Sequence, residues 1–281
     1  MKEFGQRVIS TTISLTLLLL LIYYANTSLG SLFVLAALSL LSVWALQEYD
    51  ALLHTKATSI IFFFSASISV VWINLNYAFL QGIFPSKLYF SLLLGLMPIY
   101  FVCLVAAAKP AKGFLLKTAS SGFSLLYITA PLSLMLWILY SPEFSGRIWF
   151  LYLIFVTKIS DVAGYLGGKL LGRVPLAPKI SPRKTWEGSI LGVFFSIVCS
   201  LLFAYLQQKY AWSNFSLSYT SALFLGAFLS CIGQIGDLFE SLCKRDAGKK
   251  DSSKLPGFGG VLDLLDSLLF TTPFLTCFLL G

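Results

Sequence analysis

The chain has 281 residues, of which 57% are hydrophobic and 11% are charged, and its formal net charge is +8. Soluble domains of this size carry about 25% charged residues, so the composition excludes an ordinary soluble globular protein. The class that fits is an all-α polytopic membrane protein, because a spanning helix needs roughly 20 mainly apolar residues.

Several apolar segments are long enough to span a bilayer. In chain order they cover residues 8–25, 29–47, 58–80, 88–108, 118–140, 147–166, 188–207, 219–236 and 260–280. The first has too long an apolar run for a typical signal peptide, and no clear small-x-small cleavage site follows it, so we expect it to be retained. The sequence therefore predicts about nine transmembrane helices.

The basic residues indicate the orientation of these spans. With a cytoplasmic N-terminus, 17 of the 20 lysines and arginines face the cytoplasm, and the opposite face keeps Lys87, Arg147 and Lys209. This asymmetry follows the positive-inside rule and predicts a cytoplasmic N-terminus. A basic cytoplasmic face suits anionic membrane lipids or nucleotides. We expect no nucleic-acid partner, because the basic loops are short and interleaved with membrane spans.

Acidic residues are concentrated in the second half of the chain, where eight of the 12 follow position 160. We therefore expect residues 1–140 to form a scaffold and lipid-facing wall, and residues 141–281 to form a catalytic region with its site on the cytoplasmic face. Two long cytoplasmic loops, at about 158–188 and 237–262, hold most of the unusual polar residues in this prediction.

A first polar group begins where the sixth span ends. Lys158 and Asp161 are three residues apart, so on a helix they share a face. The glycines between 164 and 172 permit close approach of the backbone, and a helix-packing seam would explain them. Such a seam does not explain Asp161.

The segment that follows, Ile180–Gly188, offers several phosphate-binding side chains. Pro182 restricts Ser181 to an extended or turn geometry. Arg183 can bind two phosphate oxygens in a fork, and Lys184 can act as a mobile point charge. The plainer alternative is an ordinary positive-inside loop with a tryptophan anchor.

A second polar group begins at the end of the eighth span. Asp237 and Glu240 are spaced i, i+3, as are Asp263 and Asp266 at the start of the last span. Hard oxygen ligands without His or Cys favour Mg²⁺ over zinc, and Asp237 and Asp263 are the natural pair to hold one ion between two helices. A helix cap and a solvated basic loop would explain Asp263. They would not explain Asp237 at the predicted end of a helix, where the helix dipole disfavours acids.

These groups resemble the phosphatidate cytidylyltransferase (CDP-diacylglycerol synthase) family. Ser181-Pro-x-Lys-Thr-Trp-Glu-Gly188 and Gly236-Asp-Leu-x-Glu-Ser241 look like that family's motifs. The C-terminal signature matches in order and spacing at Ser241, Lys244, Arg245, Lys250, Asp251, Pro256, Gly257, Gly259, Gly260, Asp263 and Asp266. The chain departs from the family at two positions, with Phe258 for the usual His and Leu264 for the usual Arg. These departures put any role for a histidine acid or base in doubt.

The resemblance implies that phosphatidate attacks the α-phosphorus of CTP, giving CDP-diacylglycerol and pyrophosphate in the bacterial inner membrane. It implies a homodimer and a two-cation centre with Mg²⁺ on Asp237 and Asp263 and with room for a monovalent ion such as K⁺. Asp161, Glu240 or Asp266 would contribute to that centre. Phosphate and substrate contacts are expected from Ser181, Arg183, Lys184, Thr185, Lys244, Arg245, Lys250, Gly259 and Gly260.

Two rival functions use the same residues. Another CTP-dependent membrane lipid enzyme, such as a polyprenol kinase, would need the same cation centre. An ion-coupled transporter could use Asp161, Asp237 and Asp263 as coupling sites. Transporter sites usually lie near the bilayer midplane, whereas these acids cluster at predicted span ends among lysines.

Overall fold

The computed structural model describes residues 19–52, 59–107, 114–141, 145–212, 214–248 and 260–281. Within these ranges, seven helical segments are long and apolar enough to cross a membrane, and a shorter apolar stretch lies in α4. The elements are α2 (Ser28–Leu52), α3 (Ser59–Leu80), α4 (Ser86–Ala107), the continuous α5 (Phe114–Ser124), η1 (Leu125–Thr129) and α6 (Ala130–Tyr140), α7 (Gly146–Leu171), α8 (Trp186–Tyr210), α9 (Tyr219–Asp246) and α10 (Val261–Leu280).

This arrangement confirms the predicted all-α polytopic fold. The number of spans stays a prediction, because most of the first expected span, 8–25, lies outside the described residues, and only 19–24 of it is seen as helix. The chain divides into two compact units, residues 1–140 with 249–264 and residues 141–248 with 265–281. Helix α10 contributes residues to both units.

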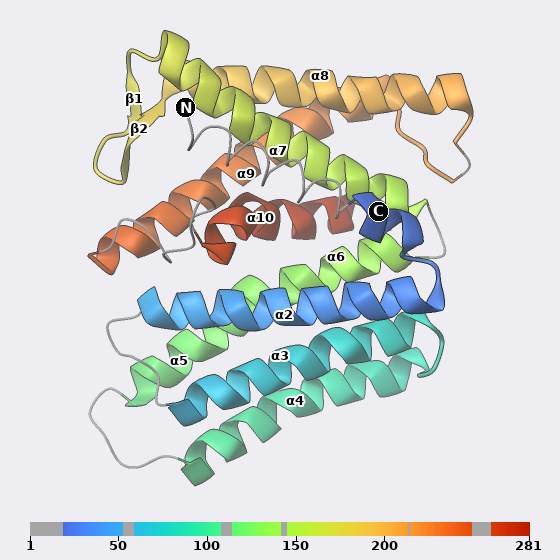
Figure 1. Ribbon diagram of the computed structural model, residues 1–281, viewed down its shortest axis with the longest axis vertical. Coiled ribbons are helices and arrows are strands. Elements are labelled where there is room, and N and C mark those ends of the chain that lie inside the picture. The colour runs from blue at the N-terminus through green and yellow to red at the C-terminus, as the bar shows by residue number, and fades with distance from the viewer. Residues whose placement is uncertain (1–18, 53–58, 108–113, 142–144, 213, 249–259) are drawn as a thin grey trace. The chain divides into compact units, whose positions relative to one another are not determined.

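The first unit is a helical bundle with polar pairs in its interior. Figure 1 shows α2, α3 and α4 running alongside one another, and α3 also packs on α6. The hydroxyl of Ser69 bonds those of Ser42 and Thr129 at 3.0 and 2.7 Å, and Asn76 donates to the carbonyl oxygen of Ser133 at 2.6 Å. Polar side chains within apolar spans need such partners, because lipid offers none.

Helices α7, α8 and α9 of the second unit pack closely because glycines line their contacts. A Cβ atom at Gly188 of α8 would lie 2.5 Å from the carbonyl oxygen of Gly164 on α7. One at Gly226 of α9 would lie 2.9 Å from the Cβ of Ser200 on α8. The glycines in α7 therefore belong to a packing seam, as the sequence analysis allowed.

A short antiparallel hairpin joins α7 to α8 (Figure 1). Strand β1 (Pro175–Ala177) pairs with β2 (Ser181–Thr185), with Pro175 opposite Thr185 and Ala177 opposite Ser181. Strand β2 runs directly into α8, whose first turn is capped by Thr185 through a 3.2 Å bond from the amide of Gly188. The extended geometry expected for Ser181 is confirmed, but the sequence analysis missed the hairpin.

Two expected helix ends were wrong. Helix α7 continues to Leu171 rather than 166, and α9 continues to Asp246 rather than 236. Residues 158–171 and 237–246 are therefore helical and not parts of long loops. Asp237 lies well inside α9, so the argument that it stands against the dipole at a helix end does not hold. Ion pairs with neighbouring lysines allow these polar turns to remain helical.

Candidate functional site

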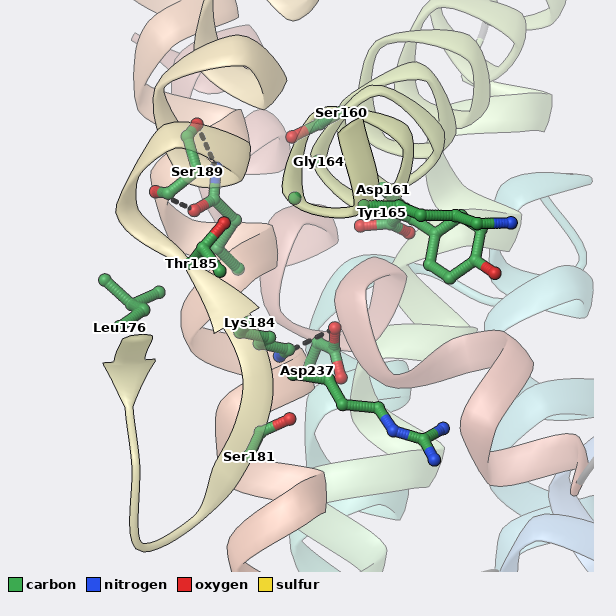
Figure 2. Close-up of a pocket in the computed structure, with 14 residues that line it drawn as sticks. Ser160, Asp161, Gly164, Tyr165, Leu176, Ser181, Lys184, Thr185, Ser189 and Asp237 are labelled. Carbon is green, nitrogen blue, oxygen red and sulfur yellow. Dashed lines mark hydrogen bonds and ion pairs between the residues drawn. The ribbon is translucent and has the colours of Figure 1, made fainter. Parts of the chain in front are cut away.

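The second unit contains a cavity of about 570 Å³ between α7, the hairpin, α8 and α9 (Figure 2). This volume is in the range of small-molecule binding sites. Its walls bring together six residues that the sequence analysis selected, from three separate stretches of chain. They are Asp161, Ser181, Arg183, Lys184, Thr185 and Asp237.

An ion pair crosses this cavity from the hairpin to α9. The Nζ of Lys184 lies 2.7 Å from Oδ2 of Asp237, and Figure 2 shows the two side chains facing each other. Their side chains are 24% and 37% exposed overall, but the Nζ atom of Lys184 is itself buried where it meets Asp237. A mobile cation next to a carboxylate is a suitable arrangement for a ligand that carries both phosphate and metal.

A second charged cluster joins α7 to α10. Lys158 donates to Oδ2 of Asp161 at 3.1 Å and to the hydroxyl of Ser267 at 2.9 Å, and Ser267 donates to Asp161 at 2.8 Å. The buried carboxyl group of Asp266 lies within electrostatic range of Asp237, Lys158 and Asp161. Carboxyl groups from three helices thus gather in one region, where lysines offset part of their charge.

Side-chain amide and hydroxyl groups connect the helices on one side of the cavity. Gln234 of α9 bonds the side chain of Ser189 on α8 and donates to the hydroxyl of Ser230 at 3.1 Å. Ser230 in turn bonds Ser160 of α7 at 2.6 Å. The sequence analysis missed these residues and Ser267, because single serines and a glutamine in apolar spans carry no spacing signal.

Three predicted site residues of α9 do not line this cavity. Glu240 is 2% exposed and its Oε1 lies 2.7 Å from Nζ of Lys244, one turn further along α9. Arg245 donates through Nε to the carbonyl oxygen of Ile180 at 3.1 Å, which ties the end of α9 to the hairpin. Their predicted roles in metal and phosphate binding stay predictions.

Asp263 lies in the first turn of α10, where its Oδ2 accepts a 2.9 Å bond from the amide of Gly260. This is the helix-capping contact that the plainer interpretation of the sequence allowed. Asp263 and Gly260 belong to the first unit and Asp237 to the second, so their pairing around one metal ion stays a prediction. Lys250, Phe258 and Gly259 fall outside the described residues.

Comparison with known proteins identifies the relatives of this chain. The model of the cytidylyltransferase family matches residues 5–280. The chain belongs to the cytidylyltransferase family. It is 33% identical over 285 residues to the phosphatidate cytidylyltransferase of Chlamydia pneumoniae, an alignment that covers 98% of this chain and 91% of that protein.

Other members of the cytidylyltransferase family are similarly related. The Chlamydia trachomatis phosphatidate cytidylyltransferase is 35% identical over 294 residues, covering 99% of this chain and 93% of the relative. The Rickettsia bellii phosphatidate cytidylyltransferase is 34% identical over 209 residues, covering 72% of this chain and 89% of the relative. The predicted resemblance is confirmed, and with its apolar helices the chain is an integral membrane protein of this family.

Mg²⁺ stays a prediction for this chain, and the chemistry of the donor set is compatible with it. Among the described residues, no group of three or more His, Cys, Asp or Glu side chains is arranged as a metal cage. Mg²⁺ is usually held by one or two carboxylates together with substrate phosphates and water, so a full protein cage is not required. Asp237 and Asp161 line the same cavity, so their carboxylates would be the candidate ligands for such an ion.

Proposed function

We propose that the protein transfers CMP from CTP to phosphatidate, giving CDP-diacylglycerol and pyrophosphate for phospholipid synthesis. The observation that carries this proposal is the basic cavity with its Lys184–Asp237 ion pair, in a chain matched by the cytidylyltransferase family over residues 5–280. Full-length relatives named phosphatidate cytidylyltransferase support the choice of acceptor lipid.

The proposed reaction is a displacement at phosphorus. A phosphate oxygen of phosphatidate forms a bond to the α-phosphorus of CTP, and the bond from that phosphorus to the oxygen leading to the β-phosphorus breaks. The electron pair leaves with pyrophosphate. Because the attacking oxygen is already ionised, no strong base is needed, and positioning and charge stabilisation supply most of the rate.

Each cavity residue has a distinct part in this proposal. Lys184 and Arg183 contact phosphate oxygens of the nucleotide, and Thr185 holds the start of α8 so that these cations keep their positions. Asp237 and Asp161 would hold Mg²⁺, which would neutralise phosphate charge. Asp263 is proposed as a further ligand, as the family resemblance implies.

A labelling experiment tests the reaction. Purified protein in mixed micelles receives MgCl₂ and either α- or γ-³²P-labelled CTP, with phosphatidate or polyprenol as the acceptor. We expect the α-label in a lipid product with phosphatidate only, and the γ-label in pyrophosphate. A γ-label in polyprenol phosphate would instead identify a kinase. Ion flux in liposomes without CTP turnover would identify a transporter.

We further propose that the site faces the cytoplasm from the bacterial inner membrane, because CTP is a cytoplasmic substrate and the basic residues follow the positive-inside rule. Cysteine labelling in intact cells tests this orientation. A cysteine introduced at Lys179 of the hairpin should be protected from a membrane-impermeant reagent until the cells are opened. Labelling of intact cells at that position would contradict the proposed orientation.

A further inference from the structure

Helix α2 carries a buried carboxylate to the start of α10. Glu48 is 4% exposed, and its two oxygens accept separate backbone bonds. The amide of Val261 lies 3.0 Å from Oε1, and the amide of Leu262 lies 2.8 Å from Oε2. All three residues belong to the first compact unit, so the contact lies within one described body.

This contact solves two problems at once. The first amides of a helix have no partners within the helix and carry partial positive charge. A carboxylate buried in an apolar span is costly unless it is hydrogen-bonded. Glu48 accepts two charge-assisted bonds from two amides. The amides gain the partners that the helix cannot offer, and the buried carboxylate gains the hydrogen bonds that it needs.

The start of α10 differs from the starts of α8 and α9 in where the residues that satisfy its first amides come from. Helix α8 is capped by the preceding Thr185, and α9 by the preceding Ser218. Helix α10 follows Gly260, which has no side chain to cap it. The amides of Val261 and Leu262 are instead satisfied by Glu48, which lies 213 positions before Val261 in the chain.

The next residue after the two clamped amides is Asp263, whose carboxylate bonds the amide of Gly260 in the same turn. We propose that Glu48 is a positioning residue for the transferase reaction, because it fixes the turn that carries Asp263 and so sets where that carboxylate can meet a divalent cation. The inference rests on the proposed function of Asp263 as a metal ligand.

The test compares variants of full-length protein in detergent by two measurements. Mn²⁺ binding, followed by electron paramagnetic resonance, reports the cation site without turnover. CMP transfer at increasing MgCl₂ reports the same site in action. Glu48→Gln keeps the side-chain size, but its NH₂ group would face one of the two amide donors. We expect it to weaken Mn²⁺ binding about tenfold and to raise the half-maximal MgCl₂ concentration similarly, with little change in kcat at saturating MgCl₂.

A matched control separates positioning from stability. Asn76→Ala removes a buried polar contact of α3 in the same unit, and we expect it to lower the melting temperature without changing Mn²⁺ affinity. If Glu48→Gln does not fold, the same measurements are made on Glu48→Asp. This variant keeps the negative charge, but its side chain is one methylene too short to reach both amides. An unchanged Mn²⁺ affinity in the folded Glu48 variant, or no Mn²⁺ binding by the wild type, would overturn the inference.

The two proposals fail in different ways. Weaker Mn²⁺ binding by Glu48→Gln, in a protein that makes no CDP-diacylglycerol, would support the positioning role and reject the proposed function. Normal CDP-diacylglycerol synthesis with unchanged Mn²⁺ affinity in that variant would leave the function standing and reject the positioning role.

Discussion

At the scale of single residues, the Lys184–Asp237 ion pair distinguishes this cavity from an ordinary polar surface. Asp237 is 37% exposed and can be solvated without its partner, so we expect the pair to contribute only about 0–1 kcal/mol to folding, although the Nζ atom of Lys184 is itself buried. Its value to the protein therefore lies in the charges that it presents to a ligand. Loss of either charge should therefore affect activity more than stability.

Removing the cation of Lys184 should reduce catalysis without unfolding the protein. We expect Lys184→Ala to lower kcat/KM for CTP about 100- to 1,000-fold, or roughly 3–4 kcal/mol, because a charge that stabilises the transferring phosphates is lost. The melting temperature should change little. Lys209→Ala is the matched control, since this lysine lies in the last turn of α8 and does not line the cavity. Equal activity of the two variants would contradict the assignment.

Asp263→Asn offers a test of metal binding with the fold preserved. The amide oxygen of asparagine can still accept the bond from Gly260, so α10 should keep its start. The negative charge is lost, and we expect Mg²⁺-dependent CMP transfer to fall at least about 100-fold. Circular dichroism should match the wild type. Retained turnover would remove Asp263 from the proposed site.

At the scale of elements, the close packing of α7 against α8 holds the hairpin in place. Gly188 lies three residues after the end of β2, and a side chain there would meet the α7 backbone at Gly164 and Gly168. The position of Lys184 and Thr185 thus depends on a contact that leaves no room for a methyl group.

We expect Gly188→Ala to lower both stability and activity. The added Cβ would lie 2.5 Å from the Gly164 oxygen, which is backbone and cannot move aside cheaply. The expected cost is about 1–3 kcal/mol, measured as a lower midpoint in thermal unfolding. Gly95→Ala in α4 is the control, because its Cβ would meet nothing within 4 Å and alanine favours helix. A neutral Gly188→Ala would contradict the tight seam.

The sequence predicted apolar elements well because apolarity is what a bilayer requires. It did not predict where α7 and α9 end, since turns containing Lys158, Asp161 or Asp237 lack the apolar signal and are stabilised by ion pairs instead. The hairpin has strands of three and five residues without clear alternation, so its pattern was equally typical of a loop. Spacing indicated phosphate and metal chemistry, but it could not indicate that Lys184 meets Asp237.

At the scale of the whole molecule, the family match runs through nearly the entire chain, while no cluster of three or more potential metal ligands occurs among the described residues. Such a protein should need its cation for catalysis and not for folding, unlike a protein built around a structural zinc site.

Chelation tests this distinction. We expect EDTA to abolish CMP transfer and excess MgCl₂ to restore it, while the melting temperature in EDTA stays within a few degrees of the untreated value. Zinc should not replace magnesium, because the proposed ligands are oxygen atoms. Full activity after exhaustive chelation would exclude a metal-dependent mechanism.

The contact between Lys184 and Asp237 also affects the order in which ligands bind. Each charge already has its opposite within 2.7 Å, so a bare cation must displace the ammonium and a bare phosphate must displace the carboxylate. A nucleotide that arrives with its cation brings both replacements together, and the two side chains simply exchange partners. We therefore expect the chelated nucleotide to bind much more tightly than either component offered alone.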